Sequence, residues 1–113
     1  SPVVLGSVSS TSYMDGAHFV ASFPAAGLVF VTGITSDSVC VVDVSDPSTP
    51  TVKEGLVDST YMNGAHDIAW DPAAKLLFAT GANSDSLAVM SVAGTVAKHL
   101  APTPSPTSWT YGK

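Results

Sequence analysis

Two histidines at matching positions are the residues of this chain with the clearest capacity for chemistry. His18 and His66 lie 48 residues apart, and each ends a Gly-Ala-His triplet. A neutral imidazole is a good ligand for zinc, copper or iron, so two that converge could form part of a metal site. A catalytic zinc site uses about three protein ligands, and the third histidine, His99, breaks the spacing. We therefore expect no bound metal, and His18 and His66 are the candidates if one binds.

A structural role for the same histidines is the interpretation we favour. Each histidine is followed at one fixed interval by a threonine and then by an aspartate, and the two sets are His18, Thr32, Asp37 and His66, Thr80, Asp85. A histidine that bonds an aspartate in a partly dry site rigidifies the fold and leaves no buried donor unpaired. The pattern resembles the buried His–Asp–Ser/Thr network of WD-repeat blades, and this resemblance implies that the six residues form a structural network.

The chain shows no arrangement of nucleophile and base with catalytic spacing. None of its serines lies in a Gly-x-Ser-x-Gly elbow, and its Gly-containing loops lack the lysine and spacing of a phosphate-binding loop. We expect no catalytic residue and no cofactor, so the sequence favours a non-enzyme and leaves an enzyme open.

A tyrosine and an Asp or Asn precede each Gly-Ala-His triplet: Tyr13 with Asp15, and Tyr61 with Asn63. Such a polar and aromatic rim could bind a sugar by stacking and hydrogen bonding, or calcium through oxygen atoms. Asp-Gly and Asn-Gly are also ordinary turn dipeptides. We favour turns, and ligand binding stays the alternative.

All these matching residues belong to one internal repeat. Residues 11–44 laid over 59–92 without a gap give 18 identities in 34 positions. A period in the forties with strand-like content indicates one supersecondary unit used repeatedly.

The apolar positions alternate with a period of two, which predicts β-strands separated by Pro-, Asp- and Ser-containing turns. The predicted strands are 18–23, 28–33, 38–44 and 50–57 in the first unit, 66–70, 76–81, 86–92 and 95–101 in the second, and an additional strand at 2–8. Four short antiparallel strands at this period are typical of a β-propeller blade, and a β-sandwich is the competing fold. We predict an all-β chain of two four-stranded blades plus an N-terminal strand.

Composition excludes several partners. Nine acidic residues against four basic ones give a net charge of -5, whereas a phosphate backbone is bound mainly through Lys and Arg, so we expect no nucleic-acid partner. The apolar runs are far shorter than the ~20 residues that span a bilayer, so we expect no membrane span. Cys40 is the only cysteine, which rules out an intrachain disulfide and leaves the redox compartment open.

The end of the first unit resembles a known family. The run from Val39 to Pro50, with Val-Asp-Val-Ser-Asp-Pro at its centre, is similar to the signature of the LVIVD repeat, and residues 64–70 and 76–81 resemble that family's next two strands. The second unit departs at Ser91-Val92-Ala93-Gly94, where the Val-Asp-Val-Ser-Asp-Pro motif does not recur. The resemblance implies a propeller-like repeat domain without a defined reaction, commonly in exported or surface proteins. An extracellular, surface or lumenal location is thus favoured, and the compartment stays open.

Two blades are too few to close a ring of four to eight. We expect residues 1–9 to be the outer strand of a preceding blade, 10–57 and 58–101 to be two blade-like repeats, and 102–113 to be a Pro-rich extended tail. The remaining blades could come from a longer chain, from self-association or from a larger assembly. The expected function is a non-enzymatic structural or protein-interaction module. The alternatives are a propeller that binds a carbohydrate or small ligand, and a metal-dependent propeller enzyme that uses His18 and His66.

Overall fold

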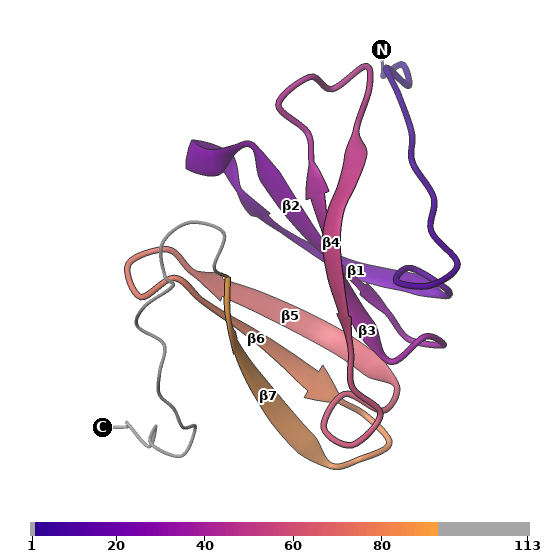
Figure 1. Cartoon of the computed structure of the whole chain (residues 1–113), viewed down its shortest axis with the longest axis vertical. Helices are drawn as coiled ribbons and strands as arrows, with labels where there is room; N and C mark the ends of the chain where they lie inside the picture. The colour runs from indigo at the N-terminus through magenta and orange to yellow at the C-terminus, as the bar shows by residue number, and fades with distance from the viewer. Residues whose placement is uncertain (1, 93–113) are drawn as a thin grey trace.

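The protein folds into two antiparallel β-sheets (Figure 1), seen in a computed structural model that describes residues 2–92. The first sheet has the order β1-β2-β3-β4 and the second has the order β5-β6-β7. Their elements are β1 (Ala17–Phe23), the short 3-10 helix η1 (Pro24–Ala26), β2 (Leu28–Gly33), β3 (Ser38–Asp43), β4 (Thr51–Val57), β5 (Ala65–Asp71), β6 (Leu76–Gly81) and β7 (Ser86–Ser91). The predicted all-β class is confirmed. Within residues 2–92, no helix has the length and apolar character needed to cross a membrane.

The repeat in the sequence is also a repeat in the backbone. Residues with positive φ stand at the same places in both units: Gly16 and Gly64, Gly27 and Lys75, Asp37 and Asp85. These places lie before the first strand of each unit and in its first and second turns, where a left-handed residue reverses the chain. Asp tolerates this conformation better than most residues because its short polar side chain can hydrogen-bond locally.

Each sheet also interrupts its first ladder at the same place. The register shifts between Ala17 and Val20 in β1, and between Ala65 and Ile68 in β5. Such a bulge takes one backbone N–H out of the ladder. A threonine side chain on the neighbouring strand replaces the lost acceptor in each sheet, as described below.

The core lies between the two sheets. Its residues from the first sheet are Leu28, Phe30, Val39 and Val41, and they share one core cluster with Leu77 and Ala79 of the second sheet. All six side chains are buried. β5 packs against β1 and β2, and the ring of Trp70 in β5 lies 4.7 Å from that of Phe23 and 4.9 Å from that of Phe30. The sheets therefore meet most closely at their first strands.

The prediction of an additional strand at 2–8 is wrong, since residues 2–10 have no regular secondary structure. Around Gly6 this segment lies against the loop between β3 and β4, and it pairs with no strand. At Gly6 an added Cβ would lie 2.6 Å from the carbonyl oxygen of Ser48 and 2.7 Å from that of Pro47. The segment contacts backbone carbonyls there without the N–H partners that a ladder requires. The strand predicted at 95–101 and the tail at 102–113 lie outside the described residues.

Candidate functional site

The structure brings the two histidines of the repeat together. His18 in β1 and His66 in β5 have ring centroids 4.2 Å apart, and the ring of Phe19 lies 4.7 Å from that of His18 and 5.3 Å from that of His66. His66 Nδ1 is 3.2 Å from the Asp67 carboxylate. No group of three or more His, Cys, Asp or Glu side chains suited to a metal ion is found within residues 2–92. The cluster is an aromatic contact between the first strands of the two sheets.

Asp37 has partners other than the expected histidine. Its carboxylate accepts hydrogen bonds from the backbone N–H of Gly64 at 2.8 Å and from the hydroxyl of Ser59 at 2.9 Å. Its carbonyl oxygen accepts the N–H of Asp58 at 3.0 Å. Hydrogen bonds that join His18 to Asp37, or His66 to Asp85, are absent within the described part of the chain. The aspartate sits in the β2–β3 turn, where its left-handed backbone directs it to the loop that enters the second sheet.

Thr32 joins the two sheets through its hydroxyl. The side chain is fully buried, accepts the N–H of Phe19 at 3.0 Å and donates to the carbonyl of His66 at 2.9 Å. Thr80 accepts the N–H of Asp67 at 3.0 Å in the same way, but it is exposed. The predicted threonines thus complete the bulges of β1 and β5, and only Thr32 also reaches a second sheet within residues 2–92.

Two serine pairs, which the sequence indicated only as turn residues, hold the segment that precedes the first strand of each unit. Ser36 and Ser38 share a hydrogen bond of 2.7 Å, and Ser38 donates to the carbonyl of Tyr13 at 2.8 Å. Ser84 and Ser86 share a bond of 2.7 Å, and Ser86 donates to the carbonyl of Tyr61 at 2.7 Å. Both pairs belong to a Ser-Asp-Ser tripeptide that recurs in the two units, at 36–38 and 84–86. This tripeptide indicates a turn in the sequence, but it does not identify the carbonyl that each serine reaches.

The polar and aromatic rim is built largely from turns. The backbone carbonyl of Asp15 accepts the N–H of Thr35 at 3.0 Å, and the side chains of Asn63 and Asn83 share a hydrogen bond of 3.2 Å. The ring of Tyr13 lies over Gly55, where an added Cβ would overlap it. Tyr61 is 57% exposed. The two tyrosines therefore have different surroundings and do not form one stacking platform.

The most informative surface is the face of the second sheet that points away from the first. This outer face consists of Leu76, Phe78, Thr80, Leu87 and Val89, which share one side of β6 and β7. Their counterparts in the first sheet, Leu28, Phe30, Thr32, Val39 and Val41, are the residues that the second sheet buries. Val39 is 2% exposed but Leu87 is 58% exposed, and Val41 is 6% exposed but Val89 is 36% exposed. Equivalent positions of the repeat are therefore buried in the first unit and exposed to solvent in the second.

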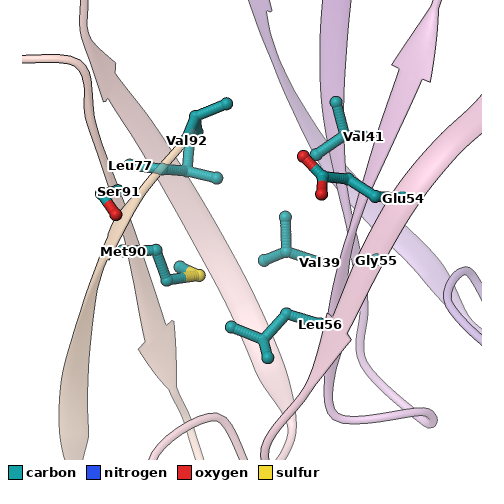
Figure 2. A pocket seen from close by; sticks show the side chains of 9 residues that line it. All are labelled: Val39, Val41, Glu54, Gly55, Leu56, Leu77, Met90, Ser91 and Val92. Carbon is teal, nitrogen blue, oxygen red and sulfur yellow. The ribbon is translucent and has the colours of Figure 1, made fainter. Parts of the chain in front are cut away.

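A groove of about 240 Å³ opens between the later strands of the two sheets (Figure 2). Its walls are mainly apolar, with Val39, Val41 and Leu56 on one side and Leu77, Met90 and Val92 on the other. Ligand pockets usually have volumes of about 300–1,000 Å³ and converging polar groups. The groove is smaller than such pockets, and its lining is mainly apolar. We therefore interpret it as a gap that arises because the two sheets are close at β1 and β5 and diverge toward β4 and β7.

Two aspartates in the Val-Asp-Val-Ser-Asp-Pro motif, Asp43 and Asp46, have lowered pKa values. The Asp43 carboxylate accepts hydrogen bonds from the hydroxyl of Ser45 at 2.6 Å and from its backbone N–H at 2.9 Å. These bonds, and to a smaller extent the charge of Lys53, hold the pKa of Asp43 below its ordinary value. Ser48 acts in the same way on the pKa of Asp46. Both pairs close turns after β3.

We expect Ser45→Ala to raise the pKa of Asp43 toward the ordinary value of about 3.9, because it removes the first of the two hydrogen bonds. The side-chain carboxyl carbon of Asp43, followed by NMR through an acid titration, reports this shift. A pKa lowered by folding contributes stability above the unfolded pKa, and that stability is lost as the pH falls through the folded pKa. Ser48→Ala is the matched control, since it should move the pKa of Asp46 and leave that of Asp43. An unchanged pKa of Asp43 in Ser45→Ala would contradict the assignment.

Comparison with protein-family models, with curated proteins and with solved structures finds no match to this chain. The resemblance to the LVIVD repeat therefore depends on the motif residues alone.

Proposed function

We propose that this protein is a non-enzymatic structural and protein-interaction module whose two sheets are blades of a larger propeller-type ring. The observation that carries the proposal is the difference in burial between repeated positions. Val39 and Val41 are covered by the next unit, whereas their counterparts Leu87 and Val89 on the outer face are exposed. The partner that fits this face is another unit of the same repeat, because such a unit already covers the equivalent face of the first sheet.

The energetics favour a covered outer face. Full burial of a Leu or Val side chain stabilises a protein by about 1.5–3 kcal/mol relative to its exposure. Leu87, Val89 and the half-buried Leu76 and Phe78 lie on one side of β6 and β7. A contiguous apolar patch of this kind marks an interaction surface.

The arrangement of the two sheets supports a blade-like unit. Blades of a propeller surround a central channel, so neighbouring sheets are closest at their first strands and diverge outward. β1 and β5 are in contact, and the groove lies between the later strands. The meander order of each sheet is also that of a blade, in which each strand pairs with the next.

Sedimentation velocity of the full chain tests the proposal. We expect wild type to self-associate through the outer face with increasing concentration, and Leu87→Ser/Val89→Ser to shift the distribution toward the monomer. The matched control is Val3→Ser/Val4→Ser, since these valines are 75% and 86% exposed outside both sheets. A wild type that stays monomeric at all concentrations, with a β-sheet circular dichroism spectrum, would refute the proposal. Equal association of the two double variants would also refute it.

A further inference from the structure

The first strands of the two units differ in burial, and the difference is opposite to the one on the outer face. In the second unit, Ala65 is fully buried and Ile68 packs against the core between the sheets. Their counterparts 48 residues earlier, Ala17 and Val20, are exposed, Val20 by 63%. We call this uncovered start of the first unit the head surface, and it consists of Met14, Ala17, His18 and Val20.

The side chain of Val20 points away from the second sheet. Val20 pairs with Val31 in β2, whereas the neighbouring pair, Ala21 with Phe30, packs into the core. Because side chains alternate between the two faces of a strand, Val20 and Val31 share the far face of the first sheet. Around Gly6 the N-terminal segment lies against the β3–β4 loop, and β1 at the opposite edge of the sheet stays uncovered at Val20.

The contact between the two sheets includes a hydrogen bond whose two groups recur in the repeat. Thr32 donates to the carbonyl of His66 at 2.9 Å and so joins the first sheet to the first strand of the second unit. Thr80 has the place of Thr32 on the outer face. Its hydroxyl accepts the N–H of Asp67, and its proton has no acceptor within residues 2–92. The counterpart of the His66 carbonyl is the carbonyl of His18 in β1.

From these observations we propose that the head surface of a second copy of this chain docks on the outer face of the first copy, head to tail. Thr80 of one copy donates to the His18 carbonyl of the second copy, as Thr32 donates to His66 within one chain. The two surfaces lie on opposite sides of the pair of sheets, so one chain cannot bring them together. No residue of either surface carries a carboxylate or an ammonium group, so like charges do not oppose the contact there.

The inference rests on the proposed function and names the partner of the outer face. The next unit belongs to a second copy, and it presents its first strand. Because the two surfaces are different, the interface is heterologous, and it builds rings or filaments instead of stopping at a dimer.

Sedimentation velocity of the full chain, alone and in mixtures, tests the docking. Val20→Asp should block the head surface, and Leu87→Ser/Val89→Ser should block the outer face. Each variant alone should stay monomeric at concentrations at which wild type forms species larger than a dimer. An equimolar mixture of the two should form a heterodimer, because the intact outer face of one variant meets the intact head surface of the other. Val3→Asp is the matched control for the added charge and should associate as wild type does, since Val3 is 75% exposed outside both sheets.

Two milder variants sharpen the experiment. Val20→Ser removes the apolar side chain without adding a charge and should weaken the association in the same direction, so it replaces Val20→Asp if that chain lacks a β-sheet circular dichroism spectrum. Thr80→Val should raise the dissociation constant by about threefold to tenfold, because the His18 carbonyl of the second copy loses its donor. An unchanged constant overturns the proposed bond, and with it the match to the contact between the sheets.

The outcomes separate this inference from the proposed function. If Val20→Asp associates as wild type does while Leu87→Ser/Val89→Ser does not, the copies meet outer face to outer face. The head-to-tail docking is then overturned, although the outer face remains an interface. A mixture of the two variants that stays monomeric also overturns the docking. If Leu87→Ser/Val89→Ser associates as wild type does, the proposed function fails together with this inference.

Discussion

Replacing Phe30 with alanine is expected to lower the free energy of unfolding by about 3–5 kcal/mol. Phe30 is completely buried between the sheets and packs on Trp70. Its removal loses the transfer free energy of the ring and leaves a cavity that the surrounding strands fill only in part. Urea denaturation followed by circular dichroism, at a protein concentration that keeps the chain monomeric, measures the loss.

The repeat supplies the control for this experiment. Phe78 occupies the matching position in the second sheet, pairs with Val89 as Phe30 pairs with Val41, and is only half-buried on the outer face. Phe78→Ala should cost less than about 2 kcal/mol in the monomer, since less apolar area returns to water. Equal losses at Phe30 and Phe78 would contradict the difference in burial between the two faces.

Thr32→Val is expected to destabilise the protein by about 1–3 kcal/mol although it preserves the shape of the side chain. The hydroxyl of Thr32 accepts the N–H of Phe19 and donates to the carbonyl of His66. Valine leaves both backbone groups without this partner, and Thr32 itself is 0% exposed, so water has little access to replace it. The same denaturation experiment reports the change.

Thr80→Val is the matched comparison for Thr32→Val. Thr80 makes the bond to the N–H of Asp67 but is exposed, so water can take the place of its hydroxyl. We expect a cost below about 1 kcal/mol, the usual scale for a solvent-exposed hydrogen bond. A larger loss for Thr80→Val than for Thr32→Val would show that the contact between sheets is unimportant for stability.

The sequence was sufficient to predict the seven strands β1 to β7 because their signals are local. The alternation of apolar residues, together with turns such as Pro24-Ala25-Ala26 and Ser36-Asp37-Ser38, indicates where β1, β2 and β3 begin and end. The period of 48 residues also predicts that the two sheets have equivalent positions. These features depend on residues close together in the chain.

Partners from different units could not be predicted in the same way. The Asp37 carboxylate accepts the N–H of Gly64, 27 residues away, from a residue with a left-handed backbone. Residue types alone do not show which distant N–H such a carboxylate meets. Residues 2–8 show why a local apolar pattern is not enough, since they were predicted to be a strand but have no regular secondary structure. The difference between Leu87 and Val39 is likewise set by which unit lies beside each residue.

Within each sheet, every strand pairs with its neighbour in sequence, and this order has a consequence for folding. Hairpins with short turns bring together residues that are close in the chain, so each sheet can form with little loop-closure entropy. Contacts such as Phe30 with Trp70 and Thr32 with His66 join residues far apart in sequence, and they depend on the sheets meeting. We therefore expect stability to be graded along the chain. The first sheet has its apolar face covered by the second sheet, while the second sheet has its outer face exposed, so the second sheet should unfold locally at a lower free energy than the whole protein.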